Sequence, residues 1–195
     1  LALGFSMMWS VARAANFNHG DIFMIGGMGT VVFLGLGMPI WLSAILAVLI
    51  ATIAGGLIER YLVRPFNREP NSVGWMLTTV AIGVMIVGAG TAVLGSSARP
   101  MPSPLMEDPI RIGGAGIFPQ EILLPLVAVA ATFALYLFQN RTHFGRAIRA
   151  VAANRTAAEL MGIDADRVTL YVFAVAGGLG AIAGFLVAPV IQAST

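Results

Sequence analysis

The sequence predicts an all-α protein, a polytopic transmembrane helix bundle with about five to six spans. The first observation is composition: the 195 residues are 58% hydrophobic and 10% charged, with a mean hydropathy of +0.88, whereas soluble domains carry roughly 25% charged residues. The second is that the apolar residues form runs close to the roughly 20 residues that cross a bilayer. The third is that charged residues gather between these runs. We therefore expect one transmembrane domain over residues 1–195.

Five apolar runs reach, or nearly reach, the length of a span. They cover residues 22–36, 40–58, 73–94, 122–138 and 168–190, and residues 1–15 look like the end of a sixth. A tight turn at Gly37-Met38-Pro39 separates the first two runs. Because the chain begins within an apolar run and stops without a polar tail, we expect it to be an internal fragment of a longer protein.

Arginine accounts for all eleven Lys and Arg side chains, and its distribution predicts the topology. Residues 59–72 hold three arginines and residues 140–167 hold five. Cytoplasmic loops carry an excess of such residues, so both segments are expected on the cytoplasmic side of the cell inner membrane. The proline-rich segment, residues 95–121, then falls on the opposite side by alternation.

The segment 140–167 is predicted to dock another protein. Thr156 and Glu159 have the spacing of a capping box at a helix start, and Gly162 is expected to end this helix. About two turns of helix are marginal alone in water, yet Ala157, Leu160 and Met161 share one apolar face. That face either contacts a partner or rests on the protein's own helix ends. Arg146, Arg149 and Arg155 would suit an acidic partner surface.

The polar segment 16–21 has two interpretations. One is a solvated turn at the cytoplasmic end of the membrane, with Asp21 as N-cap of the next helix. The other is a break within the membrane, where Asn16, Asn18, His19 and Asp21 line a pathway. A carboxylate at the bilayer centre costs about 2.5–3.5 kcal/mol on insertion scales. Asp21 would then need a polar cavity or a partner such as Arg13 or His19.

Several residues within the apolar runs also bear on function. Thr78 and Thr79 are candidate pathway residues, although threonine hydroxyls in helices often bond their own backbone. Gly178 to Ala183 match a dinucleotide-binding fingerprint by letter, but they lie inside an apolar run without the required strand. Gly180 and Gly184, with Ala176, instead predict a ridge for close helix packing, either internal or between subunits. The same is expected of the glycines at 83, 88 and 90.

Residues 59–65 begin where an apolar run ends, so Glu59 is expected to be a solvated helix end and Pro65 to end the helix. The sequence lacks Cys, and it contains neither a nucleophile paired with a base nor a histidine cluster with metal-ligand spacing. We therefore predict no catalytic residue, no metal site, no cofactor and no nucleic-acid partner.

Three segments together carry a family resemblance. These are Asn16-Phe17-x-His19-Gly20-Asp21, Glu59-Arg60 followed by Pro65, and the stretch from Gly145-Arg146 through Arg149-Ala150 to Gly162-Ile163-Asp164. In order and spacing they resemble the LivH-type permease of branched-chain amino acid ABC transporters. The family commonly has an apolar residue in place of Asn18 and Glu in place of Asp21, and similar permeases carry urea or short amides.

The resemblance implies a function and a set of partners. The helix around residues 153–162 would be a coupling helix that docks into a cytoplasmic ATPase subunit. The system would be completed by a second permease subunit, two such ATPase subunits, a periplasmic or extracellular solute-binding protein and membrane lipid. The permease itself would not be an enzyme. One alternative is an ATP-independent secondary transporter or channel, but such proteins usually carry ionisable residues within their spans, and these spans have none. Another is a membrane anchor of an enzyme complex, which would typically carry histidines in its spans, and these spans have none.

Overall fold

The computed structural model describes residues 1–12, 16–66, 74–95, 97, 100–101, 110–112 and 115–191. The helices are α1 (Ala2–Ala12), α2 (His19–Gly35), α3 (Ile40–Ile58), α4 (Arg64–Phe66), α5 (Gly74–Leu94), α6 (Pro119–Arg141), α7 (His143–Ala153), α8 (Arg155–Leu160) and α9 (Ala165–Ile191). A π-helical turn, η1 (Glu59–Val63), joins α3 to α4, and the strands β1 (Ile110–Ile112) and β2 (Ala115–Ile117) form an antiparallel hairpin.

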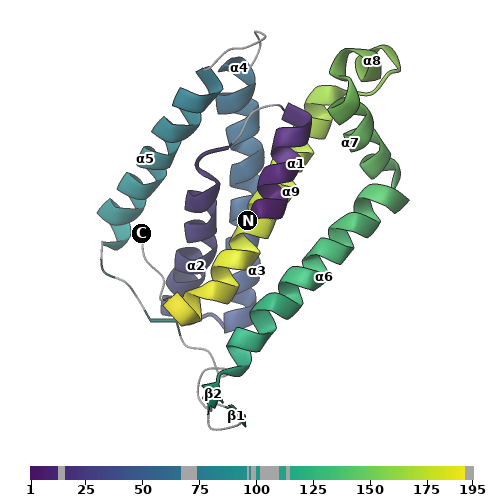
Figure 1. Cartoon of the computed structure of the whole chain (residues 1–195). Coiled ribbons are helices and arrows are strands. Elements are labelled where there is room, and N and C mark those ends of the chain that lie inside the picture. Colours follow the sequence, from purple (N-terminus) through teal and green to yellow (C-terminus); the bar gives the residue numbers. More distant parts are fainter. Residues whose placement is uncertain are drawn as a thin grey trace.

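The centre of the bundle is built by α2, α3 and α9, with α1 packed on α9 (Figure 1). Small residues allow these helices to approach closely. A Cβ atom on Gly55 of α3 would lie 2.5 Å from the backbone oxygen of Phe173, and one on Gly177 of α9 would lie 2.6 Å from that of Ala51. Gly184 faces the backbone of Phe23 on α2 just as tightly. The predicted glycine ridge therefore serves internal packing.

Two helices flank this centre with little burial. In Figure 1, α5 and α6 lie on opposite sides of the central group. The most apolar part of α6 has no buried residue, and that of α5 has few. Their exposed side chains are large and apolar, for example Leu77 and Val84 on α5 and Leu126 and Phe133 on α6. These two helices present their apolar faces to whatever surrounds the chain.

The predicted spans agree with the observed helices in position. Residues 40–58 match α3 at both ends, and each other run lies within a residue or a turn of its helix. In the described residues four helices are long and apolar enough to cross a membrane, namely Ile40–Phe66, Gly74–Leu94, Pro119–Arg141 and Ala165–Ile191. The apolar helices α1 and α2 are shorter. The predicted turn before α3 is confirmed, with Gly37 at φ +82°.

The two ends of the bundle differ. One end of the bundle holds α4, α7 and α8, and the other holds the β1–β2 hairpin (Figure 1). Arg64 in α4 pairs with Asp166 in the first turn of α9, which links the two arginine-rich segments directly. The prediction that these segments share one end is confirmed for their described residues, while Arg68 lies outside them. The hairpin is a small addition to a fold predicted to be all-α.

Candidate functional site

The helical structure is interrupted between α1, which ends at Ala12, and α2, which begins at His19. This interruption is called the break below. Asn18 is the N-cap residue of α2, and its side chain makes no capping hydrogen bond. Asp21 lies in the first turn of the helix, so the prediction that Asp21 is the N-cap is wrong. The backbone N–H groups of Asp21 and Ile22 donate to the Asn18 carbonyl oxygen instead. The Asn18 carbonyl oxygen therefore accepts the first hydrogen bonds of α2.

The polar residues at this break are buried. Asn16 and Asn18 are each 1% exposed and His19 is 5% exposed. Within the described part of the chain, neither amide atom of either asparagine and neither ring nitrogen of His19 has a hydrogen-bond partner. The His19 ring lies against Gly4 of α1 and Gly180, near the midpoint of α9. The solvated-turn interpretation is therefore wrong, because this break lies inside the bundle.

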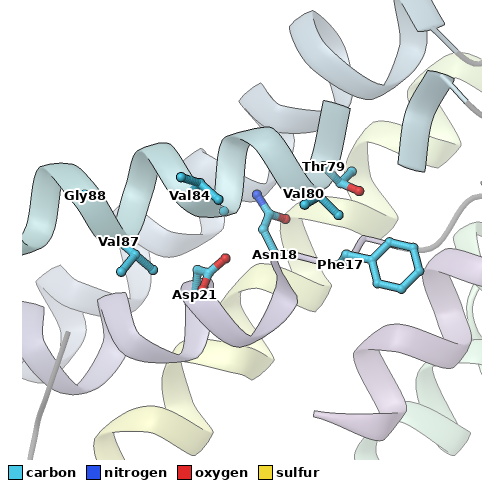
Figure 2. Close-up of a pocket in the computed structure, with 9 residues that line it drawn as sticks. Phe17, Asn18, Asp21, Thr79, Val80, Val84, Val87 and Gly88 are labelled. Atoms are coloured by element: carbon cyan, nitrogen blue, oxygen red, sulfur yellow. The ribbon is translucent and has the colours of Figure 1, made fainter. Parts of the chain in front are cut away.

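A pocket of about 510 Å³ opens between the start of α2 and the middle of α5. Phe17, Asn18 and Asp21 line one wall, and Thr79, Val80, Gly83, Val84, Val87 and Gly88 line the other. In Figure 2 the side chains of Asn18 and Asp21 both point toward α5. The pocket is mostly apolar, and its polar lining residues are Asn18, Asp21 and Thr79. Such a lining, with few convergent polar groups, is typical of small-molecule sites.

The other candidate pathway residues are placed differently. Thr79 lines the pocket, and its hydroxyl donates to the Met76 carbonyl oxygen. Thr78 donates to Gly74 and is not among the lining residues, and neither are the buried Asn16 and His19. The described residues thus bring Asn18, Asp21 and Thr79 together at one pocket.

The ion-pair partners predicted for Asp21 and the packing role predicted for the α5 glycines are only partly confirmed. His19 forms no ion pair with Asp21 in the described part of the chain, and Arg13 lies outside it. A Cβ on Gly83 would lie 2.5 Å from Asp21 Oδ2, so this glycine makes room for the carboxylate. A Cβ on Gly88 would meet nothing within 4 Å, so the prediction that Gly88 is a packing glycine is wrong within this chain.

Glu59 is 2% exposed, so the prediction that it is a solvated helix end is also wrong. Arg64 Nε donates to Glu59 Oε1 at 3.0 Å, and Arg64 Nη2 donates to Oε2 at 2.8 Å. Arg64 also donates to the backbone oxygen of Asp166 at 2.9 Å and pairs with its carboxylate. A bidentate partner of this kind is what permits a buried carboxylate. The pair therefore ties the end of α3 to the start of α9.

The helix that contains Pro65 is described up to Phe66, and residues 67–73 lie outside the described residues, so the expectation that Pro65 ends this helix stays a prediction. The chain continues from α3 through the π-turn η1 into α4, giving one apolar helix from Ile40 to Phe66. A π-turn uses hydrogen bonds five residues apart, and it adds one residue to the turn. Arg64 follows Glu59 by five residues, and their side chains meet. Turns of this kind are frequent at functional sites.

The short helix α8 begins at a different residue from the predicted one. Its N-cap is Asn154, whose side chain accepts a hydrogen bond from the Ala157 backbone N–H. The predicted capping box of Thr156 and Glu159 is therefore wrong. Glu159 pairs with Arg155, and Arg155 also pairs with Asp166. The helix does end as predicted, with Gly162 at φ +84°.

The apolar face of α8 is uncovered. Leu160 is 85% exposed, Met161 is 83% exposed and Ala157 is also exposed, whereas Ala158 is the residue buried against the bundle. This face does not rest on the protein's own helix ends. The exposed Arg146 and Arg149 contact nearby groups, since Arg146 bonds to His143 and Arg149 to Gln139 and Asn140.

Sequence reasoning missed three features of these sites. The five-residue spacing of Glu59 and Arg64 was a signal for a π-turn pair. Asn154, three residues before Ala157, was an N-cap candidate. Val80, Val84 and Val87 follow the helical period that would have indicated one wall of the pocket. No local signal indicates that Asp166 is the partner of Arg64, because the two are 102 residues apart.

Long apolar helices around a buried polar break define a multi-pass membrane protein. The family model described as "Branched-chain amino acid transport system / permease component" matches residues 1–195. The chain therefore belongs to this family of membrane permease components. This agrees with the resemblance found in the sequence.

Individual relatives are consistent with this assignment. The chain is 29% identical over 200 residues to the high-affinity branched-chain amino acid transport system permease protein LivH of Salmonella typhimurium, covering 95% of this chain and 64% of that protein. It is 28% identical to the corresponding protein BraD of Pseudomonas aeruginosa, with the same coverage. It is 26% identical over 186 residues to the fructose import permease protein FruF of Bifidobacterium longum, covering 94% and 50% of the two chains. No solved structure gives a significant match.

Proposed function

We propose that this chain is part of a permease subunit of an ABC importer that translocates branched-chain amino acids or similar small solutes by ATP-driven alternating access. The observation that carries the proposal is the exposed apolar face of α8 in a chain of this permease family. The chain spans 64% of the length of the LivH and BraD relatives. The activity is therefore proposed for a whole permease subunit and not for these residues alone.

The proposal includes an orientation and partners. Residues 59–72 and 140–167 face the cytoplasm across the cell inner membrane, by the excess of arginine in both. A cytoplasmic ABC ATPase subunit docks on the second segment, and a second permease subunit and a solute-binding protein complete the importer. The exposed faces of α5 and α6 are available to lipid or to the second permease subunit.

The docking surface consists of α8 and the end of α7. Leu160 and Met161 supply most of the contact free energy, because burying each side chain is worth about 1.5–3 kcal/mol, whereas an exposed ion pair is worth at most about 1 kcal/mol. Arg146, Arg149 and Arg155 add orientation, with Ala157, Glu159 and Gly162 shaping the helix. Asp166 forms ion pairs with both Arg155 and Arg64. Through these pairs, a force applied to α8 is transmitted to α9 and to the helix that continues from α3.

The pathway runs past the buried break between α1 and α2. Asn16, Asn18, His19 and Asp21 are its polar groups, with Thr78 and Thr79 on α5. Support comes from the burial of the first three without partners and from the pocket that Asn18, Asp21 and Thr79 share. A non-helical segment inside a membrane bundle exposes polar groups where a solute can cross, as discontinuous helices do in many transporters.

The test compares the full-length wild-type protein with Leu160→Asp and Leu160→Met. A charge on this face should abolish ATP-dependent uptake and co-purification of the ATPase, while membrane insertion stays normal. Leu160→Met keeps the apolar area and should behave like wild type. Unchanged uptake in Leu160→Asp would remove the docking role of α8, and uptake without any associated ATPase would favour an ATP-independent transporter or channel.

The solute is tested separately, because relatives of the chain are named for different cargo, including fructose. Uptake of radiolabelled leucine, urea, acetamide and fructose into cells that carry the complete importer would identify the class. Transport of leucine alone is the expected result. Transport of urea or acetamide alone would replace the amino acid assignment with an amide permease.

A further inference from the structure

The arginines in the described part of the chain differ in whether a carboxylate neutralises them. Every ion pair found there uses one of three arginines, namely Arg64, Arg155 and Arg167. Three other exposed arginines pair with no described carboxylate, namely Arg141, Arg146 and Arg149. The sequence contains no acidic residue from position 122 to position 158. The described chain therefore leaves three positive charges uncompensated within nine residues.

These charges lie at the corner where α6 meets α7, on the outside of the bundle (Figure 1). Arg141 is the last residue of α6, and Thr142 caps α7 by accepting a hydrogen bond from the Gly145 backbone N–H at 2.9 Å. A Cβ on Gly145 would collide with the backbone oxygen of Gln139. The start of α7 therefore packs directly on the last turn of α6, and the corner is well defined.

The two arginines of α7 direct their side chains back to this corner. Arg149 donates to the Gln139 carbonyl oxygen and to Asn140 Oδ1, so its guanidinium lies at the last turn of α6. Arg146 bonds to the ring of His143, the first residue of α7. These partners carry no negative charge. The corner thus gathers positive charge from both helices, and an anionic group would be attracted to it.

The surface that leads to the corner is hydrocarbon. The 23 residues of α6, at about 1.5 Å each, exceed the roughly 30 Å of bilayer hydrocarbon, so Arg141 falls at the level of the headgroups. Phe133, Leu137 and Arg141 are four residues apart along α6 and share one face. Phe133 is 61% exposed and Leu137 is 37% exposed. Tyr136, which is 62% exposed, is of a type enriched at membrane interfaces.

We propose that the corner between α6 and α7 binds an anionic phospholipid. The phosphate lies beside Arg141, with added positive charge from Arg146 and Arg149, and an acyl chain lies along Phe133 and Leu137. A free anion would leave this apolar face uncovered, and an acidic protein surface would not complement it, whereas a lipid satisfies the charge and the hydrocarbon together. Arg141 is not part of the docking surface proposed for the ATPase, so the inference stands apart from that function.

The test is native mass spectrometry of the full-length permease subunit in a neutral detergent, with phosphatidylglycerol or phosphatidylcholine added. The wild type should retain phosphatidylglycerol in preference. Arg141→Gln should weaken this binding by about fivefold, the usual effect of one arginine near an anionic lipid surface, and Arg141→Lys should retain it. Arg60→Gln is the matched control, because Arg60 is also exposed, pairs with no described carboxylate and lies over the Tyr61 ring away from this corner.

Equal retention of the two lipids by the wild type, or an equal loss in Arg60→Gln, would overturn the site. The first of these comparisons needs no variant, so it decides the question even if Arg141→Gln does not fold. Inorganic phosphate and glycerophosphoglycerol, the headgroup alone, should not displace the lipid, and displacement by either would mean a free-anion site instead. Displacement by the ATPase subunit would assign the corner to a protein contact. Loss of ATP-dependent uptake would bear on the proposed function alone.

Discussion

Gly26 and Gly184 determine how closely α2 approaches α9. Each places its Cα against the backbone of the other helix, Gly26 against Ala181 and Gly184 against Phe23. In a bilayer, lipid tails are as apolar as the helices, so close packing rather than the hydrophobic effect holds helices together. A side chain at either position would separate the two helices that carry the polar break.

Gly26→Ala should therefore destabilise the folded protein by about 1–3 kcal/mol, the usual range for overpacking. Gly88→Ala is the matched control, because a Cβ there meets open space, and it should cause no loss. Thermal unfolding of the two variants in the same detergent measures the difference. Equal stability of the two variants would mean that α2 and α9 adjust without cost.

Asn154 begins α8, and its contribution can be measured against Thr156. Removing an N-cap side chain costs about 1 kcal/mol, so Asn154→Ala should speed hydrogen exchange at the Ala157 amide severalfold. Thr156→Ala should leave it unchanged, because the Thr156 side chain caps nothing in this helix. Faster exchange in Thr156→Ala alone would restore the capping box predicted from the sequence.

The ion pairs between helices form one connected chain from Glu59 through Arg64, Asp166 and Arg155 to Glu159. Its inner end is buried in η1 and its outer end is on the exposed helix α8. Arg167 is a neighbour that does not belong to this chain and pairs with Asp164 three residues away. If an ATPase docks on α8, this connection would link its movement to α3 and α9.

Arg155→Ala should lower the amount of solute transported per ATP hydrolysed by about two- to fivefold. This change corresponds to about 0.5–1 kcal/mol, the upper part of the range for an exposed ion pair. Asp166→Ala should have a similar effect, and the double variant should add little because both remove the same link. Arg167→Ala is the control and should match wild type. Simple addition of the two single effects would mean that the pair does not act as a link.

Local rules predicted some of these elements and not others. Residues 40–58 were predictable as α3 because span length and Pro39 determine its extent. The start of α8 was not, because Asn154 and Thr156 are both good capping types and the local pattern does not choose between them. The burial of Glu59 likewise depends on a contact between residues 64 and 166. Long-range pairing therefore accounts for the error at Glu59, and ambiguity between two local caps accounts for the error at α8.

The arrangement of the whole chain places α4, α7 and α8 at one end and the β1–β2 hairpin at the other (Figure 1). The alternation of arginine-rich and proline-rich segments predicted this arrangement, since charge bias and span count apply to the entire chain. The pocket between α2 and α5 was not predictable as a whole. Its polar residues were identified as candidates, but their common location depends on how α2 packs beside α5.

Because the chain has no Cys, single cysteines can report the orientation directly. Arg60→Cys and Ala153→Cys should react with a membrane-impermeant thiol reagent from the cytoplasmic side, and Gly116→Cys in the hairpin should react from the opposite side. The measurement compares labelling of intact cells with labelling of inside-out vesicles. Labelling of all three from one side would contradict the topology.

The π-turn at Glu59–Val63 makes the chain sensitive to its length at this point. Successive residues of an α-helix are rotated by about 100° around its axis. The π-turn already absorbs one extra residue, so inserting a further residue here would rotate Arg64 by about 100° away from Asp166. Every apolar span and every charge would remain in such an insertion variant, and its composition would barely change. Its two arginine-rich segments would nevertheless lose their direct link, so the spacing of these residues carries information that residue identity alone does not.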